Sequence, residues 1–256
     1  MKSYRGNAIA VGVLFIACSV ASILSVIPLG STLEDADYLS ELGTLDTGVV
    51  MTALIEFVWA ATAAGIAIGL YPILRTHSRA LALGSVAARA VEGVFVLIGT
   101  LALLALLTVS QQSLAAGPAA QSSFQPVGDA LLAVRDWSHG FVAILALAIG
   151  ALLYYVVLYT SRLIPRWLSG WGLVGAALLV VSTVMAGLAQ NFGFTTANTV
   201  LNIPIGLQEM VLAVWLIARG FDQTVVQSMQ VESPVPSGQS HGPTESEQPQ
   251  RVLRPS

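Results

Sequence analysis

Residues 137–160 read WSHGFVAILALAIGALLYYVVLYT, a stretch without a single Asp, Glu, Lys or Arg. A helix of about 20 apolar residues spans the roughly 30 Å hydrocarbon core of a membrane. Lipid offers no hydrogen-bond partner to a backbone amide, and the stretch lacks the alternation of a barrel strand. The sequence therefore predicts a transmembrane helix here.

Five further apolar runs have similar length, and they lie at 7–28, 48–71, 81–109, 168–190 and 200–219. The composition agrees with a lipid-facing surface, since 55% of the residues are hydrophobic and 10% are charged. A soluble domain has about 25% charged residues. The first run is longer than the apolar core of a signal peptide and no cleavage site follows it, so we expect it to be retained. Residues 1–221 are thus predicted to form an all-α, six-helix transmembrane bundle.

Residues 222–256 differ sharply in composition, because they are rich in Ser, Gln, Pro, Glu and Gly and poor in large apolar residues. Such a segment cannot bury enough apolar surface to fold. We predict a disordered C-terminal tail.

The basic residues fall in alternate links between the runs. On one side lie Lys2, Arg5, Arg75, Arg79, Arg162, Arg166 and Arg219. On the other side, residues 29–47 hold five acids and no base, and 110–136 is expected to be a long outer loop. Basic loops stay in the cytoplasm. The pattern predicts an inner (plasma) membrane protein with both termini cytoplasmic, and Tyr154, Tyr155 and Trp167 are expected at the inner interface.

Four ionisable residues lie within the apolar runs: Glu56, Arg89, Glu92 and Glu209. Each costs about 2.5–3.5 kcal/mol at a helix centre unless it finds a partner or a polar cavity. Counting 1.5 Å per residue from the ends of the runs places all four within roughly 6 Å of the midplane. Arg89 and Glu92 stand at i and i+3, where they can pair. The group predicts either a binding site for a proton or small solute, or a structural lock between helices.

A second group, Arg135, Asp136 and His139, lies at the predicted outer mouth. Asp136 and His139 can share a helix face. Two such ligands are too few for a metal site, so the alternative is a hydrogen-bonded cap on the helix.

No catalytic, metal-binding or nucleotide-binding motif occurs in the sequence. We therefore expect neither an enzyme nor a cofactor. A net charge of −3 without a basic stripe also predicts no nucleic-acid partner. The expected partners are the lipid bilayer and a small solute or proton. An accessory or regulatory role, with a protein partner at the tail or the acidic outer loop, stays open.

Several segments carry a family resemblance, and they are RGNA (5–8), LYPILRTHSRALAL (70–83), ARAVEGVFVL (88–97), SRLIPRWLSGWGLVG (161–175) and QEMVLAVWLIARGF (208–221). In this order and spacing they resemble the bacterial integral membrane family called domain of unknown function 4386. The resemblance implies a multi-helix membrane protein without an assigned reaction or ligand. It also implies that Arg89, Glu92 and Glu209 occupy charged positions of the family, whereas Glu56 and Asp136 rest on this sequence alone.

Overall fold

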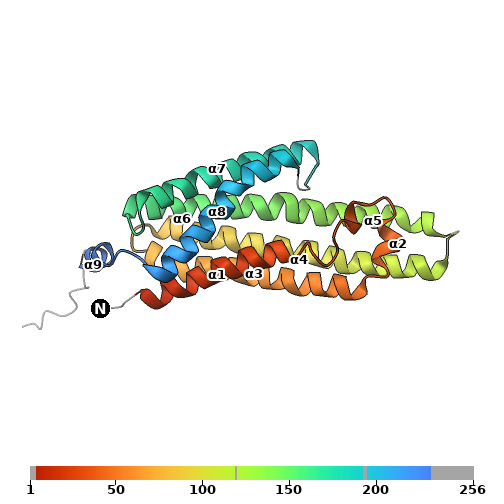
Figure 1. The fold of residues 1–256 in the computed structure, drawn as a ribbon, viewed down its shortest axis with the longest axis horizontal. Helices are drawn as coiled ribbons and strands as arrows, with labels where there is room; N and C mark the ends of the chain where they lie inside the picture. The colour runs from red at the N-terminus through yellow and green to blue at the C-terminus, as the bar shows by residue number, and fades with distance from the viewer. Residues whose placement is uncertain (1–3, 119, 193–194, 232–256) are drawn as a thin grey trace, which may run out of the picture.

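The computed structural model describes residues 4–118, 120–192 and 195–231, and within these ranges it is helical without a strand (Figure 1). Six helices of this described part are long and apolar enough to cross a membrane, which agrees with the predicted all-α fold. They are α1 (Arg5–Leu24), α3 (Asp46–Leu74), α4 (Arg79–Ala116), α5 and α6 (Gln121–Asp136 and Ile144–Ser161, joined into one rod by a π-helical segment, Trp137–Ala143), α7 (Arg166–Ala189) and α8 (Thr196–Ala218).

The membrane-length helices form a closed ring in the order of the sequence. Each packs against the next, α1 on α3, α3 on α4, α4 on α6, α6 on α7 and α7 on α8, and α8 closes the ring against α1. The short links at both hairpins, α3–α4 and α6–α7, make these helices antiparallel neighbours, as predicted.

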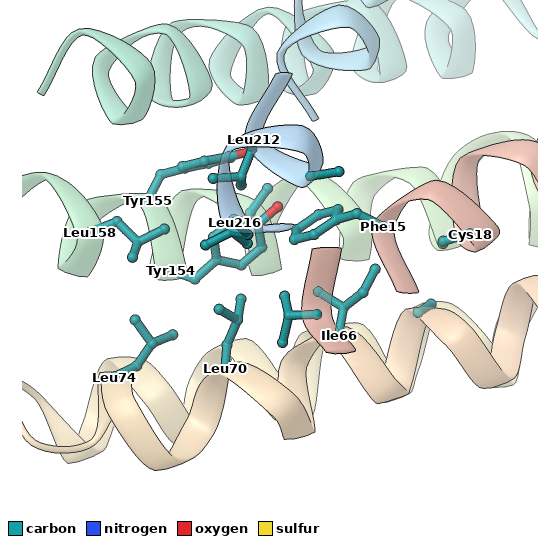
Figure 2. Packing of buried hydrophobic residues seen from close by; sticks show 14 of the residues in the cluster. Phe15, Cys18, Ile66, Leu70, Leu74, Tyr154, Tyr155, Leu158, Leu212 and Leu216 are labelled. Carbon is teal, nitrogen blue, oxygen red and sulfur yellow. The ribbon is translucent and has the colours of Figure 1, made fainter. Parts of the chain in front are cut away.

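The ring encloses an apolar core that includes Phe15, Ile66, Leu70 and Leu212 (Figure 2). Tyr154 and Tyr155 also lie in this core, each with 0% of its surface exposed. The prediction that these two tyrosines belong to an interfacial belt is wrong. They stand on the face of α6 that is turned into the ring, where their hydroxyl groups find polar partners described below.

The end of the molecule that was predicted to be the outer one is more ordered than the sequence suggested. Residues 110–136, predicted to be a loop, continue α4 to Ala116 and then form α5. Residues 29–47 contain a short 3-10 turn, Thr32–Glu34, and helix α2, Tyr38–Leu42. The physical reason is a second small core in which apolar side chains of α2, α4 and α5 pack together.

Tyr38 connects α2 to α5 in this second core. Its hydroxyl donates a 2.6 Å hydrogen bond to Asp129 Oδ1. Burial and this hydrogen bond raise the pKa of Tyr38, so the phenol stays a proton donor at neutral pH. α2 is thereby held on the α4–α5 hairpin, which extends past the other helices in Figure 1.

The segment predicted to be a disordered tail begins with helix α9, Gln223–Val231, so the prediction is wrong for these residues. The Asp222 N–H donates to the Leu163 carbonyl oxygen at 2.9 Å. Val226, only 3% exposed, packs into the main core. Residues 232–256, and the predicted inner marker Lys2, lie outside the described residues.

Arg5 ties the first helix to the last. Its Nη2 donates to the Ile217 carbonyl oxygen at 2.6 Å, and its Nη1 donates to the Leu216 carbonyl oxygen at 3.3 Å. The final carbonyl groups of a helix lack intrahelical donors and carry partial negative charge, so a guanidinium stabilises them. α1 therefore begins at the end of the bundle where α8 ends.

We expect Arg5→Ala to lower the free energy of unfolding by about 1–2 kcal/mol, because the carbonyl groups at the end of α8 lose their charged donor. Thermal unfolding of the detergent-purified protein measures the loss. Arg79→Ala is the matched control, since Arg79 is exposed and begins a helix, where a positive charge is not favoured. Equal melting temperatures for the two variants would contradict this capping role.

Candidate functional site

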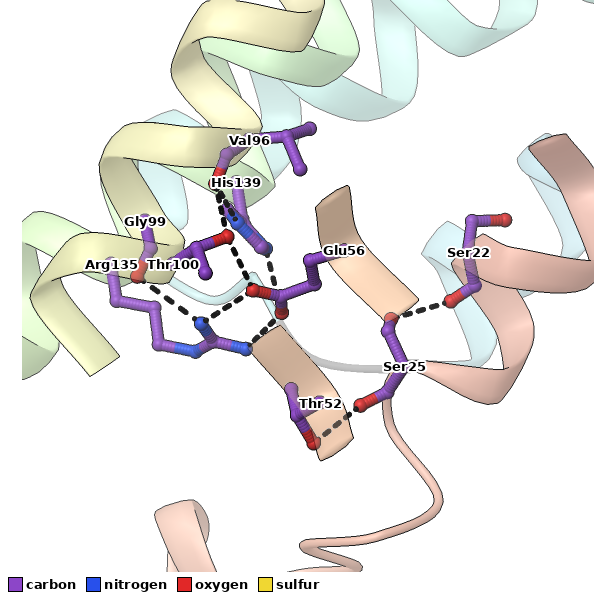
Figure 3. A network of polar contacts seen from close by, with 9 residues as sticks. All are labelled: Ser22, Ser25, Thr52, Glu56, Val96, Gly99, Thr100, Arg135 and His139. Atoms are coloured by element: carbon purple, nitrogen blue, oxygen red, sulfur yellow. Dashed lines mark hydrogen bonds and ion pairs between the residues drawn. The ribbon is translucent and has the colours of Figure 1, made fainter. Parts of the chain in front are cut away.

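Glu56 of α3 lies at the centre of one buried polar cluster, the Glu56 cluster, formed with Thr100, Arg135 and His139 (Figure 3). Glu56 has 0% of its surface exposed. Arg135 approaches both carboxylate oxygens, with Nη2 2.6 Å from Oε1 and Nη1 3.4 Å from Oε2. The Thr100 hydroxyl lies 2.7 Å from Oε2. Both oxygens of the carboxylate are thus occupied, and the ion pair joins α3 to α5.

His139 completes the cluster from the π-helical segment. Its Nε2 lies 2.7 Å from the Val96 carbonyl oxygen, which can only accept, so Nε2 carries a hydrogen and donates. Its Nδ1 lies 3.8 Å from Glu56 Oε1. A proton on Nδ1 would turn this contact into an ion pair with Glu56.

The π-helical segment explains why Asp136 does not join the cluster. A π-helix has wider turns than an α-helix, so residues three apart no longer share a face. Asp136 is exposed, while His139 points inward. The predicted grouping of Arg135, Asp136 and His139 therefore holds for the first and last residues and is wrong for Asp136.

Gly99 of α4 makes room for the imidazole because it has no side chain. A Cβ atom added at Gly99 would lie 2.1 Å from His139 Cδ2, a distance that no real Cβ shows. The Gly99 carbonyl oxygen also accepts from Arg135 Nη1 at 3.2 Å. The absence of a side chain at residue 99 thus lets both basic groups reach Glu56.

Arg89 and Glu92 form the second polar cluster, the Arg89 cluster. Arg89 Nη1 lies 2.9 Å from Glu92 Oε2, and the two residues are 1% and 0% exposed, so the predicted pairing within one helix is present. Arg89 also reaches other helices, donating from Nε to the Ala63 carbonyl oxygen of α3 at 3.3 Å and contacting Cys18 Sγ of α1 at 3.7 Å. The guanidinium thus connects three helices.

Trp59 joins the two clusters. Its indole Nε1 donates to Glu92 Oε1 at 3.3 Å, and its ring meets His139 edge-on with centroids 5.7 Å apart. Trp59 stands one turn from Glu56 on α3. The clusters are therefore stacked along α3 and α4, and the prediction that Glu56, Arg89, Glu92 and Glu209 form one group is wrong for Glu56, whose partner is Arg135.

Glu209 of α8 is half-buried and faces α6. The Tyr154 hydroxyl donates to its Oε1 at 3.4 Å. The neighbouring Gln208 accepts from the Tyr155 hydroxyl and donates from Nε2 to the Leu168 carbonyl oxygen at 3.1 Å. Among the residues that the structure describes, no arginine forms an ion pair with Glu209.

Four side chains that contact these site residues were not singled out as site residues from the sequence: Thr100, Trp59, Tyr154 and Cys18. A usable signal existed for Trp59, since the i, i+3 spacing places it on the face of Glu56. Cys18 and Tyr154 carry no such signal, because an apolar run contains many small and aromatic residues that serve only for packing. In the described ranges, no group of three or more His, Cys, Asp or Glu side chains is arranged to hold a metal ion.

Residues 10–220 match the family described as Domain of unknown function (DUF4386), which covers both polar clusters and Glu209. The chain belongs to this family. The resemblance drawn from the sequence is therefore confirmed. A search of curated proteins and a search of solved structures each found no match to this DUF4386 protein.

Proposed function

We propose that this DUF4386 protein is a non-enzymatic, multi-pass protein of the plasma membrane that binds or moves a proton or a small solute at Glu209 and the two buried polar clusters. The observation that carries the proposal is Glu209, a carboxyl group inside the helix ring without an ion-pair partner among the described residues.

The charges at the two ends of the bundle support an orientation with both termini in the cytoplasm. The links α3–α4 and α6–α7 and the end of α8 hold Arg75, Arg79, Arg162, Arg166 and Arg219. The opposite end holds the acids of residues 34–46. Positive charge near the ends of membrane helices is retained in the cytoplasm.

The interior charge balance supports a bound proton or cation. Three carboxyl groups, those of Glu56, Glu92 and Glu209, face two guanidinium groups, those of Arg89 and Arg135. An uncompensated charge in hydrocarbon is costly, so the interior needs one further positive charge. His139 beside Glu56, or a proton or small cation at Glu209, would provide it. Trp59 contacts both Glu92 and His139, and Tyr154 contacts Glu209.

A second candidate is a structural lock, in which the buried charges only hold the helices together and the protein is an accessory or regulatory membrane component. The hydrogen bonds of Glu56 favour the structural lock, because both of its carboxylate oxygens already accept from donors. A partner would then bind at the tail or at the acidic outer end.

Glu209→Gln separates the two candidates. In proteoliposomes with an imposed pH gradient and a clamped voltage, we expect the wild-type protein to dissipate the gradient and Glu209→Gln to lose at least about tenfold in rate, because the amide cannot take up a proton. Its melting temperature should stay close to that of the wild type. Glu41→Gln, which changes an exposed carboxyl group, is the matched control.

The lock predicts a different pair of results. Wild-type vesicles would then hold the gradient as long as protein-free vesicles do, and equilibrium titration would count the same number of protons on the wild type and Glu209→Gln. Either a rate for Glu209→Gln equal to the wild type or this pair of results would overturn the proton proposal.

A further inference from the structure

A basic cavity lies at the end of the bundle where α1 begins and α8 ends. It has a volume of about 450 Å³ and is formed where the α6–α7 link meets the end of α8. Arg162, Arg166 and Arg219 contribute three guanidinium groups, and all three residues are exposed. No ion pair joins any of them to an acid within the described residues. A cavity of this size accommodates a small ligand.

Asp222 also lines the cavity, so its charge must be counted. Its carboxylate caps α9, with Oδ1 accepting from the Thr224 N–H at 2.9 Å and from the Thr224 hydroxyl at 2.6 Å. These hydrogen bonds lower the pKa of Asp222, which stays an anion at neutral pH. Three guanidinium groups against one carboxylate leave the cavity positive, and it therefore favours an anionic ligand.

Aromatic rings and a helix end position the positive charge. The guanidinium of Arg166 lies 5.5 Å from the ring centroid of Tyr159, and that of Arg219 lies 5.8 Å from the ring centroid of Trp215. Such contacts hold a guanidinium without neutralising it. α7 begins at Arg166 beside the cavity, and the free N–H groups of a helix start add partial positive charge.

An apolar groove continues from the cavity along the outside of α8. It has a volume of about 400 Å³ and is lined by Met210, Val211, Val214, Trp215, Ala218 and Arg219. Trp215 and Arg219 line both the basic cavity and the apolar groove, so the two are adjoining parts of one surface. Val214 is 61% exposed on a helix long and apolar enough to lie in the membrane.

We propose that this surface binds an anionic phospholipid, with the phosphate headgroup between Arg162, Arg166 and Arg219 and one acyl chain along the groove on α8. A free phosphate would use the arginines but not the groove, and a zwitterionic lipid would use the groove but gain little from the net positive charge. Only an anionic lipid matches both parts. The inference rests on the membrane placement in the proposed function, but it is independent of Glu209.

The test compares three probes on the full-length protein in neutral detergent: phosphatidylglycerol, phosphatidylcholine and inorganic phosphate. We expect phosphatidylglycerol alone to raise the melting temperature in a saturable way. Each Arg→Gln change at 162, 166 or 219 should weaken its apparent affinity roughly fivefold. Arg75→Gln is the matched control, because Arg75 lies at the same end and stacks on a ring, Tyr71, at 5.7 Å but lies outside the cavity.

A variant of the groove keeps the test decisive if the arginine variants fold poorly. Val214→Phe fills the apolar groove while leaving the cavity intact, so it should weaken phosphatidylglycerol binding and leave the melting temperature without lipid unchanged. Equal stabilisation by the two lipids, an equal effect of inorganic phosphate, or unchanged affinity in all variants would overturn the proposal. Glu209→Gln should bind the lipid as the wild type does, so loss of proton movement and loss of lipid binding are separate results.

Discussion

Arg135→Ala is expected to destabilise the protein by about 3–5 kcal/mol, the largest effect of any single substitution proposed for this chain. The side chain is 11% exposed and that of its partner Glu56 is 1% exposed, so removal of the guanidinium leaves a carboxyl group in a space that water reaches poorly. The cost arises mainly from this unpaired group. The lost ion pair itself contributes less, because its own desolvation offsets much of its attraction.

Thermal or denaturant unfolding in detergent measures this loss. Asp136→Ala is the matched control, because Asp136 is the next residue in the chain and is exposed. The double variant Arg135→Met with Glu56→Met should regain most of the stability, since it removes both charges and fills the space with apolar atoms. If Arg135→Ala and Asp136→Ala had the same unfolding midpoint, the Glu56–Arg135 pair would not contribute to the stability of the protein.

Gly12→Ala is expected to cost about 2–3 kcal/mol through overpacking between α1 and α8. A Cβ atom at residue 12 would lie 2.7 Å from the Ala213 carbonyl oxygen and 2.7 Å from Ile217 Cγ1. The carbonyl belongs to the backbone of α8 and cannot turn aside, so the helices must separate. Gly→Ala within a helix ordinarily raises the free energy of unfolding by roughly 0.5–1 kcal/mol, so the loss expected at Gly12 has the opposite sign.

Gly6→Ala supplies the comparison on the same helix, because a Cβ atom at Gly6 would meet nothing within 4 Å. It should leave the melting temperature unchanged or raise it slightly. Thermal unfolding of both variants under one condition checks the difference, and equal shifts would show that α1 and α8 do not pack as closely as Gly12 requires.

The helix ring could be predicted from the sequence because its causes are local. An apolar run near 20 residues has one stable form in lipid, and short arginine links force neighbouring runs into hairpins. The pairing of Arg89 with Glu92 is also local, since it depends only on their spacing along one helix.

The partner of Glu56 could not be predicted in this way. Arg135 lies 79 positions away, and it reaches Glu56 only because residues 121–161 form one continuous rod. The polar composition of residues 110–136 suggested a loop, and the packing that makes them helical involves α2, a distant segment. The π-helical turn that separates Asp136 from His139 has no recognisable sequence pattern.

The closure of the ring between α1 and α8 affects how the chain is assembled. Along the rest of the ring, each membrane-length helix packs against the one that follows it in the sequence, so their contact can form once that helix is synthesised. α1 is made before the other helices of the ring, yet the α8 surface that receives Gly12 and the carbonyl groups that bind Arg5 are made after them. A nascent chain that stopped before Thr196 would therefore remain an open arc, with the Gly12 face of α1 against lipid. α8 is thus the helix whose insertion closes the bundle.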